Sequence, residues 1–286
     1  MRTAITRWSV YLLALCALGP LAGLMIASLR ASDGGLATTL LVNTAPALGM
    51  AYGLASFVLA GVIGALGARF VDARTGLLAA GITLAWAAGR GGQVDVIVRA
   101  AESASPLITM AIEGAIVGVM GVLIAAFIYA LGKPEEQVEG VEKPKLAQVI
   151  PAAVKRSVIA PGLLLALPVA IVIGGAGAWL VAMSPLKGQT IAAAIVAGII
   201  GGAAGRIADY RIPAQSLMVA IGVLAAAGPL TAFVFKVGGS PVEAAYAGKM
   251  FTLSWIAPLD WIAGGLIGVP LGVSWAASLI DKRVKA

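Results

Sequence analysis

The chain has 286 residues, of which 60% are hydrophobic and 12% are charged, and it contains 37 glycines. Such a composition cannot cover a water-facing surface with polar groups, so it excludes a soluble globular protein and indicates an integral membrane protein. The absence of histidine and the single cysteine, Cys16, exclude an internal disulfide, a cysteine zinc site and histidine-dependent haem, copper or triad chemistry. We therefore expect no metal and no cofactor.

The net charge of +7 does not indicate nucleic-acid binding, because most basic residues flank hydrophobic segments. If both termini lie in the cytoplasm, fourteen of the 20 Lys and Arg residues lie on the inner side and six on the outer side. The positive-inside rule therefore favours cytoplasmic N- and C-termini. Abundant alanine and glycine with few lysines indicate a bacterial inner (cytoplasmic) membrane.

Hydrophobic segments predict an all-α polytopic membrane protein. A hydrocarbon core of roughly 30 Å requires about 20 mainly apolar residues per helix. Eight segments fit, of which the third and sixth are short or carry a charge near one end: 8–27, 47–67, 71–89, 107–131, 158–183, 190–207, 216–235 and 261–280. The first has an alternative interpretation as a cleaved signal peptide, but its length favours a retained helix.

One stretch occurs twice. Residues 58–74 align without a gap to residues 195–211, which lie 137 positions later, and seven of the seventeen positions are identical. Three of the identical positions are charged, which similarity of composition alone would not align. A weaker similarity joins the regions around Gly114 and Gly264.

The duplication predicts two tandem four-helix repeats, residues 1–131 and 158–286, separated by a charged cytoplasmic linker at 132–157. An even number of helices per repeat places both repeats in the same (parallel) orientation, with the pseudo-twofold axis along the membrane normal.

Glycines recur every three or four residues in the second and sixth segments. They form one smooth stripe on each helix: Gly61, Gly64 and Gly67, and Gly198, Gly201 and Gly205, with Gly202 beside them. Small residues allow close helix packing in lipid, which explains the stripes; the functional alternative is that they line a narrow path. We expect these two helices to lie at the centre of the bundle and to face each other.

The pattern Arg-x-x-Asp-x-Arg follows each glycine stripe. Its members are Arg69, Asp72 and Arg74 in the first copy, and Arg206, Asp209 and Arg211 in the second. The spacing of three predicts that the first arginine of each copy pairs with the aspartate. These residues are either a charged membrane anchor or, if the turns converge, a site for an anionic solute or an anionic lipid headgroup.

Glu113 is the only acid well inside a predicted segment. An ionisable side chain at membrane depth costs a few kcal/mol on insertion scales and is a functional candidate, here for a proton- or cation-linked step. Two alternatives are a later start of the helix and an ion pair with Arg90 or Arg99.

Further irregular features lie in the outer loops and within the helices. Residues 36–42 and 250–259 are apolar although they fall between helices, so we expect short re-entrant or interfacial pieces there. Prolines interrupt three predicted helices, as they do around many transport sites: Pro161, Pro168, Pro229 and Pro270.

No catalytic motif is present, since the chain has neither a nucleotide-binding glycine loop with lysine nor a Gly-x-Ser-x-Gly elbow. The sequence favours a membrane permease or channel-like protein for a small solute, gradient-driven or served by a separate energising subunit. The alternative is a non-catalytic scaffold or lipid-binding subunit of a larger membrane complex. Expected partners are the lipid bilayer, further copies of the chain or other membrane subunits, and no nucleic acid.

Overall fold

The computed structural model describes residues 2–132, 151–152, 154–155, 157–160, 162–235 and 239–284. All regular secondary structure in these residues is helical. Six of the described helices are long and apolar enough to cross a membrane: Thr3–Ala27, Pro46–Phe70, Ser105–Leu131, Leu163–Val181, Lys187–Ala208 and Pro258–Ile280. The chain is thus a multi-pass α-helical membrane protein. Most of the predicted linker at 132–157 lies outside the described residues.

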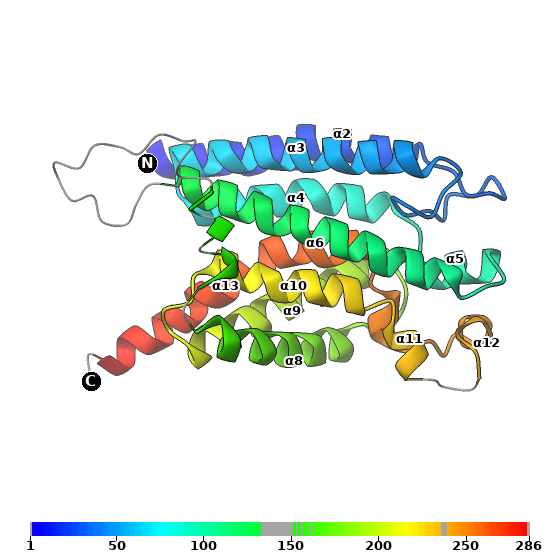
Figure 1. Ribbon diagram of the computed structural model, residues 1–286. Helices are drawn as coiled ribbons and strands as arrows, with labels where there is room; N and C mark the ends of the chain where they lie inside the picture. Colours follow the sequence, from blue (N-terminus) through cyan, green and yellow to red (C-terminus); the bar gives the residue numbers. More distant parts are fainter. Residues whose placement is uncertain are drawn as a thin grey trace.

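The helices follow one another as a series of long rods with short pieces at one end (Figure 1). The first rod is α1 (Arg2–Leu13), the π-helix η1 (Ala14–Leu18) and α2 (Gly19–Ala27). The other long helices are α3 (Pro46–Phe70), α4 (Ala73–Arg90), α6 (Ser105–Leu131), α8 (Leu163–Val181), α9 (Lys187–Ala208), α10 (Ala214–Ala227) and α13 (Pro258–Val284). The short pieces are α5 (Val94–Ala100), α11 (Thr231–Val234), α12 (Pro241–Tyr246) and the 3₁₀-helix η2 (Thr252–Trp255).

The rods run alternately between two ends of the bundle. Both termini lie at the left in Figure 1, where α6 ends and α8 begins, and we call this the terminal end. The opposite end, which we call the loop end, holds residues 28–45, 91–104, 228–235 and 239–257, including α5, α11 and α12.

Two of the eight predicted spans fall below the length or apolarity of a typical membrane helix. They are α4, which spans 18 residues and carries arginines near both ends, and α10, which spans 14 residues. Both are inner helices: α4 packs against α2, α3 and α13, while α10 packs against α6, α8 and α13. Because neighbouring helices cover them, they need less lipid-facing apolar surface. The total of eight spans stays a prediction.

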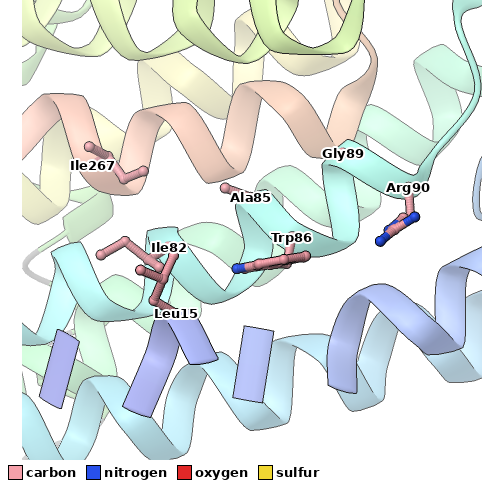
Figure 2. Close-up of a pocket in the computed structure, with 7 residues that line it drawn as sticks. All are labelled: Leu15, Ile82, Ala85, Trp86, Gly89, Arg90 and Ile267. Atoms are coloured by element: carbon pink, nitrogen blue, oxygen red, sulfur yellow. The ribbon is translucent and has the colours of Figure 1, made fainter. Parts of the chain in front are cut away.

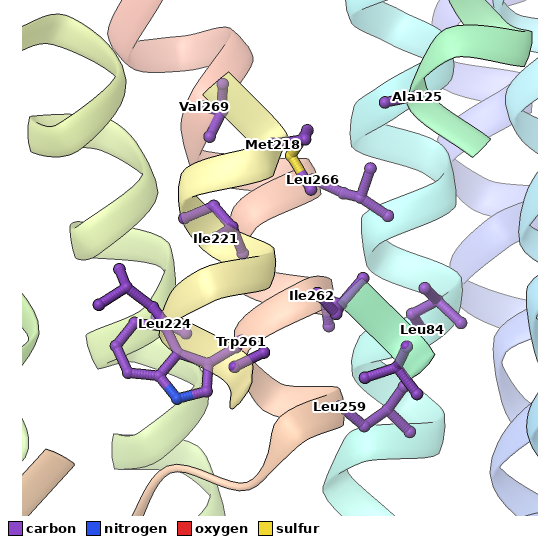
Figure 3. Close-up of a cluster of buried hydrophobic side chains, with 14 of the residues drawn as sticks. Leu84, Ala125, Met218, Ile221, Leu224, Leu259, Trp261, Ile262, Leu266 and Val269 are labelled. Carbon is purple, nitrogen blue, oxygen red and sulfur yellow. The ribbon is translucent and has the colours of Figure 1, made fainter. Parts of the chain in front are cut away.

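The main core lies between α4, α6, α10 and α13. Trp261 is fully buried and lies beside Leu224, while Ile262 and Leu266 extend from α13 toward Leu84 of α4 (Figure 3). In lipid, dispersion contacts and close backbone approach hold such helices together.

Glycines bring α9 and α13 close together. A Cβ built on Gly198 would lie 2.9 Å from the Cα of Gly268, and a Cβ on Gly272 would lie 1.9 Å from the carbonyl oxygen of Ile199. In the first half, a Cβ on Gly67 would lie 2.8 Å from the Cα of Gly76 in α4. These positions have no room for a side chain.

Two expectations about the helices are wrong. The helices α3 and α9 do not face each other. Instead α3 packs on α4, α4 packs on α13, and α13 packs on α9. The predicted span 216–235 is broken, since α10 ends at Ala227 and α11 begins at Thr231. Pro229 lies in the break, where its missing N–H cannot continue the helix.

Candidate functional site

A cluster of buried ionisable side chains lies at the loop end, between the two halves of the chain. Glu113 of α6 is 1% exposed and Asp260 of α13 is 0% exposed. Together with Lys187, at the start of α9, they line a small cavity of about 10 Å³. That volume is about the least that holds one water molecule.

Glu113 is held by the chain between α2 and α3. The hydroxyl of Thr39 donates to Glu113 Oε2 at 2.5 Å, and the backbone N–H of Leu41 donates to the same atom at 2.9 Å. Glu113 lies eight residues into α6, roughly 12 Å from its start at 1.5 Å per residue. The carboxylate is therefore well inside the helix bundle, and the loop reaches it by folding inward.

Local sequence builds this inward-folded loop. The Asn43 side-chain amide donates to the carbonyl oxygens of Thr39 and Leu40 at 3.0 and 2.9 Å, which closes a tight turn. Leu40 is 2% exposed, and a Cβ on Gly49 would lie 2.1 Å from its carbonyl oxygen. Of the apolar residues 36–42, expected to be re-entrant or interfacial, Thr38, Thr39 and Leu40 form a non-helical lining of the cavity, whereas Leu36 is exposed.

Asp260 and Lys187 form an ion pair on the other side of the cavity, in which Asp260 is fully buried and Lys187 is partly buried. Lys187 Nζ lies 3.0 and 3.1 Å from the two carboxylate oxygens of Asp260. The Thr190 hydroxyl donates to Asp260 Oδ2 at 2.8 Å, and the backbone N–H of Ala257 donates to it at 3.2 Å. A lysine at a helix N-terminus opposes the helix dipole, so the aspartate compensates a charge that the helix itself disfavours.

The lining has one polar atom without a partner. Thr38 lines the cavity and is 1% exposed, and its hydroxyl has no hydrogen-bond partner in the part of the chain that the structure describes. Buried polar groups are normally paired, so this hydroxyl marks a place for a water molecule or a small ion. If both acids and the lysine are ionised, the three groups carry one net negative charge.

The sequence identified only one member of this cluster. Asp260 was missed because the last span was predicted to start at residue 261, whereas α13 begins at Pro258. The signal was present: Pro258 at the first helical position and an acid two residues later are a typical helix start. Lys187 lies between the predicted segments 158–183 and 190–207, so it was one of the six outer basic residues in the positive-inside count.

Glu113 does not pair with either arginine that the sequence suggested. Arg99 is paired instead with Asp95, one turn earlier in α5, at 2.8 Å. Arg90 lies on the wall of a separate groove and is exposed.

The first charged turn of the repeat lies at the terminal end of α3. The expected pair of Arg69 with Asp72 does not form, because α3 ends at Phe70 and the helical spacing is lost. Asp72 instead caps α4 by accepting the N–H of Thr75 at 2.6 Å, and it pairs with Arg7 at 3.1 Å. Arg74 is exposed in the first turn of α4.

The second charged turn follows α9. Asp209 pairs with Arg211 at 3.4 Å, whereas Arg206 donates to the carbonyl oxygen of Ile212 at 2.7 Å. The backbone N–H of Arg211, which donates to Asp209 at 2.9 Å, holds the pKa of Asp209 below its usual range. Each aspartate thus bonds within its own half of the chain, and a shared anion site stays a prediction.

The six stripe glycines lie at helix contacts. Gly201 is close to Ala170 and Gly174 of α8, Gly205 to Leu217 of α10, and Gly64 to Ile128 of α6. None of the six lines the cavity at Glu113 or the groove at Arg90. Among the described residues, no group of three or more His, Cys, Asp and Glu side chains could hold a metal ion.

Comparison with protein-family models, curated proteins and solved structures found no match to the chain.

Proposed function

We propose that the chain is a permease or channel-like protein for a small solute, gradient-driven or served by a separate energising subunit. The observation that supports it most is the cluster of Glu113, Lys187 and Asp260 around one small cavity. Ionisable groups at membrane depth are costly to bury, and they are typical of ion and substrate pathways.

The position of the cluster supports a coupled mechanism. Glu113 belongs to the first half of the chain, whereas Lys187 and Asp260 belong to the second. Non-helical backbone at Thr38–Leu40, Gly91 and Ala257 also lines the cavity. In transporters, sites for coupling ions lie at the contact between repeats, beside irregular backbone. One bound proton or small cation would balance the net negative charge.

We further propose that the two halves are tandem copies. The helix contacts favour this. In the aligned halves α4 corresponds to α10 and α6 to α13, so a twofold axis converts the contact of α6 with α10 into a contact of α13 with α4. Both contacts occur. The third long helix of each half, α4 or α10, is the inner one. The surroundings of α3 and α9 differ, since α3 packs mainly on α4 and α9 mainly on α13.

The orientation is also a proposal. The positive-inside rule places the terminal end in the cytoplasm and the loop end outside, and composition favours a bacterial inner membrane. Reporter fusions after residue 286 and within the loop at residue 102 would distinguish this orientation from its reverse. An anionic solute remains a candidate because the turns at Asp72 and Asp209 each carry arginines.

A second candidate is a non-catalytic scaffold or lipid-binding subunit. It is favoured by the tight glycine contacts, which leave no room for a path along α9 and α13. In this case the cavity at Glu113 would remain closed to water.

Thiol labelling at Thr38 separates the two candidates. We would replace Cys16 by Ala, introduce Thr38→Cys, and treat intact membranes with a small membrane-impermeant reagent. A permease exposes position 38 to water during its cycle, so the thiol is modified. Protection of Thr38→Cys, with full labelling of Ser103→Cys in the loop as a positive control, would refute the permease and favour the scaffold.

A further inference from the structure

An open groove runs along α4 (Figure 2). It has a volume of about 450 Å³. Its lining comes from three elements: Leu15 of η1, Ile267 of α13, and Ile82, Trp86, Gly89 and Arg90 of α4. Apart from Arg90, these are apolar residues of helices that lie within the membrane-spanning part of the bundle.

Two glycines of α2 shape the wall of this groove. A Cβ on Gly19 would lie 2.3 Å from Cδ1 of Trp86, and a Cβ on Gly23 would lie 3.4 Å from Cγ of Arg90. The indole and the arginine stem therefore lie directly against the α2 backbone. The π-helix η1 ends next to Gly19, and such local widenings of a helix are frequent at functional sites.

Charge is confined to one end of the groove. Arg90 lies at the end nearest the loops, and Leu15 and Ile82 lie toward the other end (Figure 2). In the described ranges, the Arg90 guanidinium has no hydrogen-bond or ion-pair partner. An apolar channel with one unpaired cation at its interfacial end complements an acyl chain that carries an anionic headgroup.

We propose that this groove binds one anionic phospholipid, with an acyl chain along Ile82, Trp86 and Ile267 and the phosphate on Arg90. Guanidinium binds phosphate in a bidentate manner, and the low-dielectric boundary of the membrane strengthens that contact. The lipid belongs to the leaflet at the loop end. The proposal does not rest on the proposed transport function: the groove shares no lining residue with the Glu113 cavity, although Ala88 and Gly91 of that cavity flank Gly89 and Arg90 in the chain.

Gly89 offers a direct test of the groove. Gly89 lines the groove and a Cβ there meets no atom within 4 Å, so we expect Gly89→Leu to project into the groove and to leave the fold unchanged. Gly188, at the start of α9, is the matched control because a Cβ there also meets nothing within 4 Å and the residue is exposed. Binding would be measured by native mass spectrometry of the full chain in detergent, with phosphatidylglycerol or phosphatidylcholine added.

We expect the wild type and Gly188→Leu to retain one phosphatidylglycerol, and Gly89→Leu to bind it at least about tenfold more weakly, since the side chain displaces more than one methylene. We expect Arg90→Gln to weaken phosphatidylglycerol binding about fivefold and to leave phosphatidylcholine binding unchanged. Unchanged phosphatidylglycerol binding in Gly89→Leu would overturn the site. Equal losses of both lipids in Arg90→Gln would overturn the headgroup assignment.

Discussion

Glu113 is both a hydrogen-bond acceptor and an ionisable group, and two substitutions can separate these roles. Its carboxylate oxygen accepts hydrogen bonds from Thr39 and Leu41. Glu113→Gln keeps an oxygen that can accept both, so we expect it to remain near wild-type stability. Glu113→Ala leaves a buried hydroxyl and a buried N–H unpaired, and we expect it to lose about 1–3 kcal/mol of the free energy of unfolding. Unfolding in detergent micelles measures both, and equal losses in the two variants would refute this account of the hydrogen bonds.

The Lys187–Asp260 pair predicts strong coupling between two substitutions. Lys187→Met leaves a fully buried carboxylate without its cation, which we expect to cost about 3–5 kcal/mol. Asp260→Asn in the same chain removes the uncompensated charge and retains an oxygen for the N–H of Ala257 and the hydroxyl of Thr190. The double variant should therefore be more stable than Lys187→Met alone. A double-mutant cycle measures the coupling, and simple additivity of the two losses would contradict it.

Asp209 predicts a pH-dependent contribution to stability outside the membrane. Its pKa is lowered in the folded state by the N–H and guanidinium of Arg211. A lowered pKa stabilises the folded state at pH values above the pKa of the unfolded state. This contribution disappears as the pH falls through the pKa of the folded state. Asp209→Asn should therefore be less stable than the wild type at pH 7, and the difference should shrink at about pH 3. A difference in melting temperature that does not depend on pH would exclude this role.

At the level of helices, the stability lost on replacing a glycine should depend on the room for a Cβ at that position. Gly272→Ala directs a methyl group into the carbonyl of Ile199, so α9 and α13 must separate, and we expect a loss of about 1–3 kcal/mol. Gly188→Ala enters open space on α9 and should change stability by less than about 1 kcal/mol. Thermal unfolding in micelles compares them. Equal melting temperatures would show that the α9–α13 approach does not require a glycine at position 272.

The helices could be predicted more reliably than their ends. Apolar runs located all the long rods, because hydropathy depends only on composition over about 20 residues. The ends depend on single residues: Pro258 starts α13 earlier than hydropathy indicated, and that shift brings Asp260 into the helix and into the cluster. Glu113 was recognisable because an acid within an apolar run is rare.

Contacts between elements could not be read from the chain. The Arg-x-x-Asp spacing suggested a pair within one helix, but each helix ends before its aspartate. Lys187 resembled an ordinary surface charge, since only the fold brings α9 and α13 together over Asp260. The six-residue step from Gly61 to Gly67 predicted close packing but not which helix lies opposite.

At the scale of the whole molecule, the two halves also meet through the short helices of the loop end. At the loop end, α5 of the first half packs against α12 of the second, and the Tyr246 hydroxyl donates to the Arg99 carbonyl oxygen at 3.3 Å. Val94, Ile97 and Val98 share an apolar cluster there with Ala244, Ala245 and Trp255. Opening the Glu113 cavity toward the loop end would require these pieces to separate.

The distance between α5 and α12 tests the proposed permease function, which predicts that the halves move relative to each other around the Glu113 cavity. Ala101 and Ala247 directly follow these helices and are exposed, so both accept spin labels on the Cys16→Ala background. Pulsed electron paramagnetic resonance in lipid nanodiscs would give the distance distribution between them. We expect two populated distances whose ratio changes with pH or cation concentration, and we expect Glu113→Gln to abolish that change. A single narrow distance under all conditions would contradict the permease and identify the chain as a rigid membrane subunit.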